Sequence, residues 1–146
     1  MKQPIVIAIT SWARNKQEGE TILKTITELN NLELPIILTD ERSKFSKLSQ
    51  IRKLKNLKVF KGSGLDARIK KSFFEASHIG QFIFYLESDK IDFAKNHARV
   101  FVQEFLKNKE GMMLAVRSKK GFHKYPKYQK IMEKFLWESS VALFRG

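Results

Sequence analysis

Cysteine is absent from the 146 residues of this sequence. A chain without thiols has no disulfide, no thiolate-bound metal and no cysteine nucleophile, so these classes of site are excluded. Long apolar runs are lacking as well: the run from Ile5 to Ile9 is too short to span a bilayer and has no small-residue cleavage site after it. We interpret this run as a first strand and expect a cytoplasmic protein, with peripheral contact to the inner face of a membrane left open.

Glycine is scarce where phosphate-binding loops need it. The chain has seven glycines, and no glycine-rich loop follows the first predicted strand. Dinucleotide-binding folds and P-loop enzymes place such a loop there, because backbone N–H groups must approach the phosphates closely. The sequence therefore disfavours both classes, as well as a cytidylyltransferase-like nucleotidyltransferase. Linkers and repeats are also lacking, so we expect one domain over residues 1–146.

Acidic residues are outnumbered by basic ones. Lysine and arginine total 28 against 15 aspartate and glutamate residues, which gives a formal net charge of +13. Such a charge attracts polyanions, whether nucleic acid, anionic lipid headgroups or nucleotide diphosphates, and its sign does not choose among them. Because lysine, isoleucine and phenylalanine are all plentiful, a background composition without any binding role explains the charge equally well.

Apolar runs alternate with segments of helical period along nearly the whole chain. Strands are predicted at residues 5–9, 36–38, 57–60, 81–86 and 112–116. Apolar residues at helical spacing predict two helices whose sheet-facing sides carry Ile22, Leu23, Ile26 and Leu29, then Leu65, Ile69, Phe73 and Ala76. This alternation is typical of a three-layer α/β/α fold, with a mainly parallel sheet and helices on both faces.

Three further segments have weaker helical patterns. A crossover is expected around Phe45, Leu48 and Ile51. Asp92 predicts the N-cap of a helix whose apolar side carries Phe93, His97, Val100, Phe101 and Phe105, which makes His97 a half-buried core residue rather than a ligand. Pro126 predicts the first turn of a last helix.

Polar residues follow the first two strands, at the carboxyl edge where parallel sheets bind ligands. Ser11 and Arg14 offer a hydroxyl and a guanidinium that suit a base and a phosphate. An ordinary loop in which Ser11 or Asn15 caps the next helix explains the same residues. Asp40 follows the second strand, where its carboxylate can accept hydrogen bonds from a nucleobase or ribose, or serve a helix N-terminus.

The sharpest motif is Glu87-Ser88-Asp89, at the end of the strongest strand. In an extended chain, side chains two residues apart point to the same side, so both carboxylates face one space. Two hard oxygen ligands can hold Mg²⁺ or Mn²⁺ while diphosphate oxygens and waters complete the octahedron. The structural alternative is a turn in which Asp89 or Asp92 caps the following helix.

The order of these motifs resembles that of the family 2 glycosyltransferases, which have the GT-A fold. In that family the first strand runs into a Pro-Thr-Tyr-Asn-Arg type segment and the second ends in Asp-Asp-Gly-Ser. An Ala-Arg pair opens the next helix, and an Asp-x-Asp motif ends the following strand. The corresponding segments are similar, over about residues 5–90, to Ile9-Thr10-Ser11-Trp12-Ala13-Arg14, Asp40-Glu41-Arg42-Ser43, Ala67-Arg68 and Glu87-Ser88-Asp89.

The resemblance implies a metal-dependent transfer of a sugar from a nucleoside-diphosphate-sugar donor to an unknown acceptor, which can be a glycan, a lipid or a small molecule. It implies that Ser11 and Arg14 bind the donor and that Asp40 contacts the nucleobase. Arg68 is expected to support the nucleotide pocket. Glu87 is expected to approach the ribose or the metal, and Asp89 to bind Mg²⁺ or Mn²⁺. The chain departs from the family pattern at Thr10, Arg42, Ile69 and Glu87.

The acceptor half of the family pattern is reduced or missing after the fifth predicted strand. Glu133 is the remaining candidate for the base that deprotonates the acceptor, and a solvent-facing helix residue is its structural alternative. A short or divergent member of the family, inactive alone or completed by a partner, fits this pattern. The second hypothesis is a basic α/β module without catalysis that binds anionic membrane or, less favoured, nucleic acid.

Overall fold

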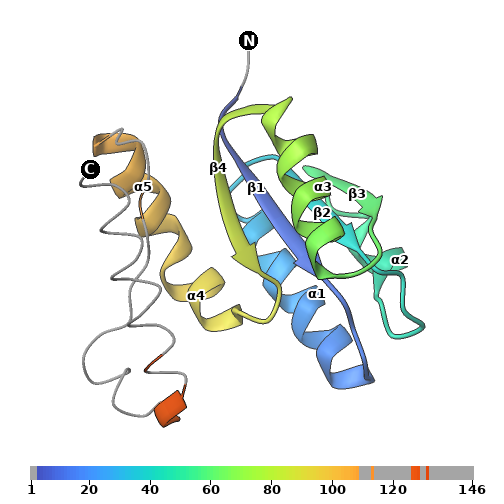
Figure 1. The fold of residues 1–146 in the computed structure, drawn as a ribbon. Helices are drawn as coiled ribbons and strands as arrows, with labels where there is room; N and C mark the ends of the chain where they lie inside the picture. The colour runs from blue at the N-terminus through green and yellow to red at the C-terminus, as the bar shows by residue number, and fades with distance from the viewer. Residues whose placement is uncertain (1–2, 109–112, 114–125, 129–130, 132–146) are drawn as a thin grey trace. The chain divides into compact units, whose positions relative to one another are not determined.

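The computed structural model describes residues 3–108, 113, 126–128 and 131 (Figure 1). The chain divides into two compact units, Met1–Lys109 and Glu110–Gly146, and the fold below is that of the first unit. Apart from Met113, the strand predicted at 112–116 lies outside the described residues, as does Glu133. Within the second unit Lys127, Tyr128 and Ile131 are helical, as the sequence predicts after Pro126.

A parallel sheet of four strands forms the centre of the first unit. The strands are β1 (Gln3–Ser11), β2 (Ile36–Asp40), β3 (Leu57–Lys61) and β4 (Gly80–Glu87), in the order β3-β2-β1-β4. Each strand contains the apolar run that predicts it, and all three pairings are parallel. From Ile5 onwards β1 is buried, and so is the whole of β2, which explains why neither shows an apolar–polar alternation.

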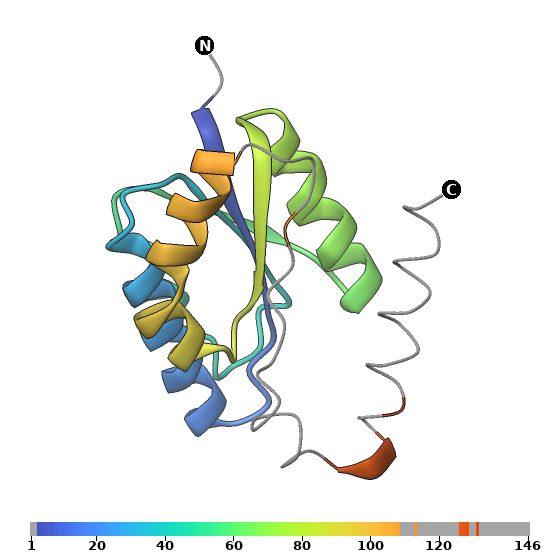
Figure 2. The ribbon, with the colours of Figure 1, turned by 90° about the vertical axis from the view of Figure 1, so that its left-hand side faces the viewer.

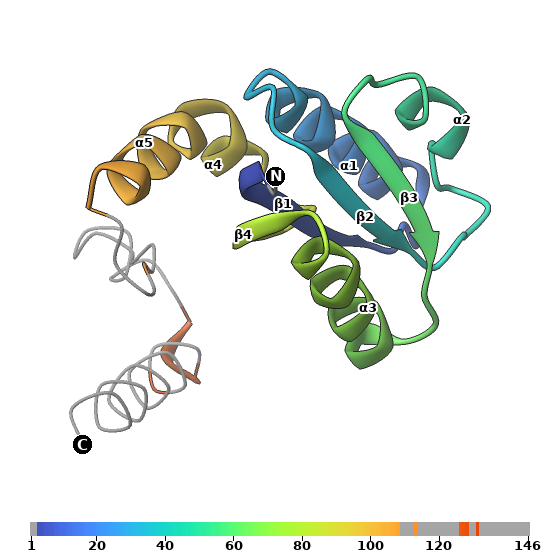
Figure 3. The ribbon, with the colours of Figure 1, turned by 90° about the horizontal axis from the view of Figure 1, so that it is seen from above.

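Helices cover both faces of the sheet. The larger core lies under α1 (Lys16–Asn30), α2 (Leu48–Ile51), α4 (Ile91–Asn96) and α5 (Ala98–Asn108), and α3 (Leu65–Ser77) covers the opposite face (Figures 2 and 3). The core under α3 is smaller, with Val6, Ala8, Ile37 and Ala76 as its buried residues. The three-layer α/β/α architecture expected from the sequence is therefore confirmed, with α2 as a single turn.

The start of α1 follows from its sequence. The side chain of Asn15 accepts a hydrogen bond from the Glu18 backbone N–H at 2.9 Å, which makes Asn15 the N-cap. Ile22, Ile26 and Leu29 of this helix are buried against the sheet, as predicted. Gly19 is also buried, and a Cβ built on it would lie 2.3 Å from the Phe45 carbonyl oxygen, so the glycine lets the segment before α2 pass close to α1.

The prediction for the helix after β4 is wrong in three respects. One helix was expected from Asp92, but α4 and α5 are separated at His97, whose φ is −130°. The N-cap is Lys90, without a side-chain capping bond, and Asp92 lies in the first turn. His97 and Val100 are exposed, because the inward face carries Ala94, Ala98 and Val102.

The predicted sheet-facing side of α3 is confirmed only in part. Ala76 is buried as expected, and the Phe73 ring contacts Tyr85 of β4 at 5.3 Å between centroids. Leu65 and Phe73 are nevertheless exposed, and Arg68 and Ser72 take buried positions instead. Small side chains at Ser72 and Ala76 let the helix lie close to the strands, and Arg68 faces inward because it finds polar partners at the end of β1. Part of the apolar surface of α3 is thereby turned outwards.

Candidate functional site at the β1 and β4 ends

The sheet has a topological switch point between β1 and β4. The chain adds β2 and β3 on one side of β1 and then returns to place β4 on its other side. The helices that follow β1 and precede β4, α1 and α3, consequently lie on opposite faces (Figure 3). Divergent connections leave a crevice outside the strand ends, and parallel α/β sheets bind ligands there.

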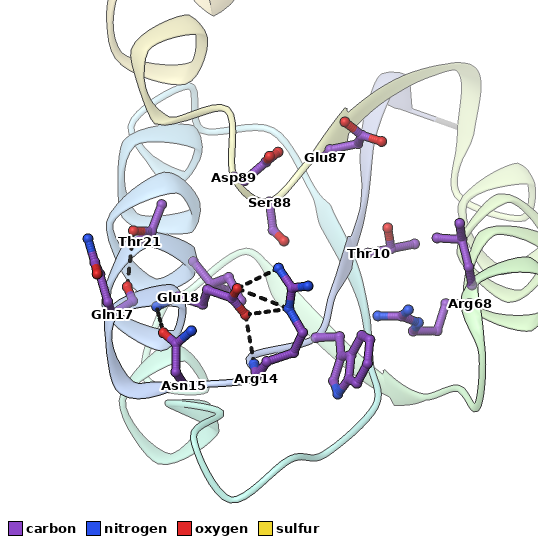
Figure 4. Close-up of a pocket in the computed structure, with 13 residues that line it drawn as sticks. Thr10, Arg14, Asn15, Gln17, Glu18, Thr21, Arg68, Glu87, Ser88 and Asp89 are labelled. Atoms are coloured by element: carbon purple, nitrogen blue, oxygen red, sulfur yellow. Dashed lines mark hydrogen bonds and ion pairs between the residues drawn. The ribbon is translucent and has the colours of Figure 1, made fainter. Parts of the chain in front are cut away.

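A pocket of about 530 Å³ lies at this switch point (Figure 4). The segment after β1, the first turns of α1, the start of α3 and the turn after β4 all contribute to its walls. Its lining residues are Thr10, Trp12, Arg14, Asn15, Gln17, Glu18, Thr21, Ile22, Leu65, Arg68, Glu87, Ser88 and Asp89. The predicted residues Arg14, Arg68, Glu87 and Asp89 thus meet in one pocket, whereas Ser11 and Asp40 lie behind it.

Asp40 is held in a buried hydrogen-bond network. Its carboxylate is 1% exposed and accepts hydrogen bonds from the Ser11 hydroxyl at 2.5 Å, the Ser46 hydroxyl at 2.9 Å and the Arg42 backbone N–H at 2.5 Å. Burying a carboxylate without hydrogen bonds costs free energy, and these three donors supply the hydrogen bonds that it needs. Asp40 therefore ties the ends of β1 and β2 to the segment before α2, and a contact with a nucleobase would require one of the two serine hydroxyls to release it.

The turn after Asp40 contains a residue in the left-handed conformation. The backbone of Arg42 has φ +58°, in the region that favours glycine. This conformation directs the Arg42 N–H to the Asp40 carboxylate. The turn that a glycine would form easily is thus formed here by an arginine, at a cost in backbone strain.

Arg68 supports the floor of the pocket. Its guanidinium donates to the Ser11 carbonyl at 2.7 Å and to the Gly64 carbonyl at 3.2 Å, and it is ion-paired with Glu41 at 3.3 Å. Gly62 makes room for it, since a Cβ there would lie 2.6 Å from the Arg68 Cγ. A buried arginine with these partners fixes the β1 end against α3.

An aromatic plane and a second arginine lie on the β1 side of the pocket. Trp12 is 48% exposed, and the guanidinium carbons of Arg14 and Arg68 lie 5.9 and 5.8 Å from its ring centroid. Arg14 is ion-paired with Glu18 at 2.6 Å. Hydrogen bonding from Arg14 lowers the pKa of Glu18 and, in return, raises that of Arg14.

The carboxylates after β4 are exposed and share one lysine. Side-chain exposure is 59% for Glu87 and 68% for Asp89, and the Lys90 ammonium lies 3.2 Å from the first and 3.0 Å from the second. Burial works to lower the pKa of Lys90, but its hydrogen bonds to Asp89 and Glu87 outweigh this effect and raise it. The capping alternative is not realised, because α4 begins without a side-chain cap. Glu87 and Asp89 both line the pocket while they pair with Lys90.

The donor set suits a divalent cation only in part. Within the described residues, no group of three or more His, Asp or Glu side chains comes close enough to hold a metal. Glu87 and Asp89 supply two carboxylates of the kind that Mg²⁺ and Mn²⁺ prefer, so a ligand and water would have to supply the remaining oxygens. Lys90 would also have to move away from them.

Several lining residues were not predicted from the sequence. Glu18 and Gln17 belong to the first turn of α1, and the Arg14-to-Glu18 spacing of four residues was the signal that could have indicated the ion pair. Lys90 could have been predicted as a counter-ion, since it directly follows the motif. Leu65 was assigned to the core instead of the pocket wall.

The described residues contain no helix that is long and apolar enough to cross a membrane. The geometry at the switch point combines an exposed aromatic plane, arginines and a pair of exposed carboxylates that share one lysine. This combination suits a ligand that has a flat ring together with anionic groups. Searches of known protein-family models, curated proteins and solved structures found no match to this chain.

Proposed function

We propose that this chain binds a nucleoside-diphosphate-sugar donor and acts as a metal-dependent glycosyltransferase of GT-A type. The observation that carries the proposal is the switch-point pocket of about 530 Å³, which Trp12, Arg14, Glu87 and Asp89 all line. A nucleoside diphosphate needs a stacking surface, cations for its phosphates and hard oxygen ligands for its metal. The pocket offers all three at the place where α/β sheets bind ligands.

Each part of the donor has a matching group. Trp12 can stack against the base, with Arg68 behind it fixing the β1 end. The backbone N–H groups at the α1 N-terminus and Arg14 suit phosphate oxygens. Glu87 and Asp89 would hold Mg²⁺ or Mn²⁺, which supplies charge neutralisation for the departing diphosphate. Ser11 does not reach the donor itself. Its hydrogen bond to Asp40 fixes the backbone next to Trp12 and so positions the Trp12 ring.

The proposed reaction also needs a base for the acceptor. In an inverting transfer a carboxylate removes the acceptor hydroxyl proton as that oxygen forms a bond to the anomeric carbon and the bond to the diphosphate breaks. Glu133 remains the proposed base, and it lies outside the described residues. The acceptor remains unassigned, and activity can require a partner that completes this half.

Calorimetric titration tests the donor site. UDP and GDP are titrated into the full chain with and without Mn²⁺, and into the variants Asp89→Asn and Asp92→Asn. Asp92 is an exposed aspartate of the α4 first turn that does not line the pocket, so it is the matched control. We expect metal-dependent binding of one nucleotide, a loss of about tenfold or more in Asp89→Asn, and no change in Asp92→Asn.

Two outcomes would contradict the proposal. One is an absence of binding by either nucleotide with metal present, and the other is equal binding by all three proteins irrespective of Mn²⁺. The alternative of a basic module without catalysis is tested alongside, with single-stranded RNA as competitor. Displacement of the nucleotide by RNA, with a steep salt dependence, would favour that alternative.

A further inference from the structure

Arg14 and Glu18 both line the switch-point pocket and are paired with each other (Figure 4). The Glu18 carboxylate accepts hydrogen bonds from Nε of Arg14 at 3.0 and 3.1 Å and from Nη2 at 2.6 Å. Two nitrogens of one guanidinium are thus held by one carboxylate, in the paired arrangement that arginine also uses to bind phosphate. Glu18 therefore occupies the part of Arg14 that a phosphate group would use.

Arg14 is the cation in the pocket wall that can turn towards a ligand. Among the described residues that line the pocket, the cationic side chains are those of Arg14 and Arg68. Arg68 is 6% exposed, and its guanidinium is bound to two backbone carbonyls and to Glu41. The Arg14 side chain, by contrast, is 66% exposed. A bound diphosphate would therefore draw on Arg14, whose guanidinium is paired with Glu18.

Glu18 keeps its place when the guanidinium leaves it. Its carboxylate also accepts a hydrogen bond from the backbone N–H of Arg14 at 2.8 Å, and its own backbone N–H donates to the Asn15 side chain at 2.9 Å. Neither bond depends on where the Arg14 side chain points. Exposed ion pairs contribute little to stability, so opening this pair disturbs the fold little. The carboxylate then remains at the pocket wall, where it can pair with Arg14 again.

The charges of the pocket make Glu18 an opponent of anionic ligands. The described pocket wall carries three carboxylates, those of Glu18, Glu87 and Asp89, against two guanidiniums. A nucleoside diphosphate is an anion, so the carboxylates repel it and a guanidinium attracts it. In the proposed donor complex a divalent cation offsets Glu87 and Asp89. Glu18 is then the carboxylate of this wall that still opposes the phosphates.

We propose that Glu18 competes with the donor's phosphates for Arg14 and so sets the affinity of the pocket for phosphate groups. The inference rests on the proposed donor site and adds to it a competitor within the chain. A ligand gains Arg14 only if its anionic group binds the guanidinium better than Glu18 does. A diphosphate brings several charged oxygens for this purpose, whereas an uncharged nucleoside brings none. Glu18 is therefore a specificity-determining residue that acts by opposing anions which do not displace it.

Calorimetric titration of four proteins tests the competition: the unchanged full chain, Glu18→Gln, Arg14→Gln and the double variant. UDP and GDP are titrated in the presence of Mn²⁺, and uridine and guanosine are the ligands without phosphate. Glutamine keeps an oxygen for the Arg14 backbone N–H but lacks the charge that holds the guanidinium. We expect Glu18→Gln to bind the nucleoside diphosphate about two- to fivefold more tightly. The gain should be smaller in the Arg14→Gln background, and nucleoside binding should not change.

Glu20→Gln is the matched control for the loss of one negative charge. Glu20 belongs to the same helix, is ion-paired with Lys47 at 2.8 Å and does not line the pocket. Its substitution should leave the affinity for the nucleoside diphosphate unchanged. Circular dichroism verifies that the variants are folded, which is expected because the Asn15 cap of α1 is kept in all of them.

Equal or weaker binding of the nucleoside diphosphate by Glu18→Gln would overturn the proposal. Weaker binding would show that Glu18 holds Arg14 in place for the phosphates instead of withholding it. An equal gain with and without Arg14 would also overturn it, because the effect would then be one of charge alone. In each of these cases the unchanged chain still binds the nucleotide, so the donor site stands. Failure of the unchanged chain to bind either nucleotide would overturn the donor site together with this inference.

Discussion

Arg42 adopts a left-handed backbone conformation that costs free energy. Its φ of +58° is unfavourable for a residue with a Cβ by about 1–2 kcal/mol, whereas glycine adopts it freely. Glycine also loses more backbone freedom on folding, by about 0.5–1 kcal/mol. We therefore expect Arg42→Gly to raise the free energy of unfolding by about 0.5–1 kcal/mol. Urea denaturation measures it.

Arg42→Ala is the control for this prediction, because alanine removes the side chain and keeps the strain. The difference between the glycine and alanine variants reports the backbone alone. Glu33 has a similar φ of +59°, so Glu33→Gly should show the same sign. A glycine variant no more stable than the alanine variant at both sites would show that the left-handed conformation costs little in this protein.

Lys90 sets the affinity of the Glu87–Asp89 pair for metal. Its ammonium lies 3.0–3.2 Å from both carboxylates, so a divalent cation must displace it. Exposed ion pairs of this kind contribute about 0–1 kcal/mol. Lys90→Met should therefore strengthen Mn²⁺ binding up to about fivefold, as measured by electron paramagnetic resonance of free Mn²⁺. Lys95→Met is the matched control in the same helix, and weaker Mn²⁺ binding in Lys90→Met would contradict this role.

At the scale of elements, the packing of α1 on the segment before α2 gives an unusual role to a helical glycine. Replacing glycine by alanine within a helix ordinarily stabilises it by about 0.5–1 kcal/mol. At Gly19 the added Cβ would meet the Phe45 carbonyl at 2.3 Å, and a backbone atom cannot yield without moving its segment. We expect Gly19→Ala to lower the free energy of unfolding by about 1–3 kcal/mol. Thermal and urea unfolding test the sign.

Lys24→Ala, at an exposed position of the same helix outside the pocket, shows the ordinary effect of alanine in α1. Because Phe45, Ser43 and Ser46 belong to one segment and Ser46 donates to Asp40, the strain should also reach the site. Nucleotide binding by Gly19→Ala should therefore be weaker than by Lys24→Ala. A stabilising Gly19→Ala would show that this segment moves aside freely.

The elements also show what the sequence could and could not predict. Continuous apolar runs at β1 and β2 predicted buried strands, because a strand that is covered on both faces carries an unbroken apolar run instead of an alternation. The pattern Leu65-Ile69-Phe73-Ala76 predicted the inward face of α3 only in part, because Ala76 is buried but Leu65 and Phe73 are exposed. Arg68 takes an inward position because of polar partners such as the Ser11 carbonyl, which lie far away in sequence. Ala94 and Ala98, on either side of the break between α4 and α5, are both buried. The spacing of apolar residues along the sequence does not indicate such a break.

At the carboxyl edge of the sheet, the sequence predicted which polar residues gather. It did not predict which of them line the pocket and which are buried behind it. Ser11, Arg14, Asp40, Arg68, Glu87 and Asp89 were all placed at this edge by the strand pattern together with the resemblance. Whether a side chain lines the pocket or lies behind it depends on partners distant in the chain. Asp40 is buried by Ser11, Ser46 and Arg42, whereas Asp89 meets only its neighbour Lys90 among the ion pairs of the described residues.

At the scale of the molecule, the switch-point pocket can be compared with a part of the first unit that lies away from it. Trp12 lines the pocket, and Phe74 lies towards the other end of α3 from Leu65 and does not line it. Hydroxyl-radical footprinting reports the exposure of both aromatic side chains at once. We expect UDP with Mn²⁺ to protect Trp12 and leave Phe74 reactive, because the nucleotide fills the pocket alone.

Val100 of α5, on the other face of the sheet, gives a second reference for this experiment. Protection of Trp12 with Phe74 and Val100 both still reactive would assign the nucleotide to the pocket. Protection of all three side chains would instead mean that the nucleotide changes the exposure of the whole unit. Local protection of Trp12 is therefore the result that separates binding in the pocket from a general effect on the fold.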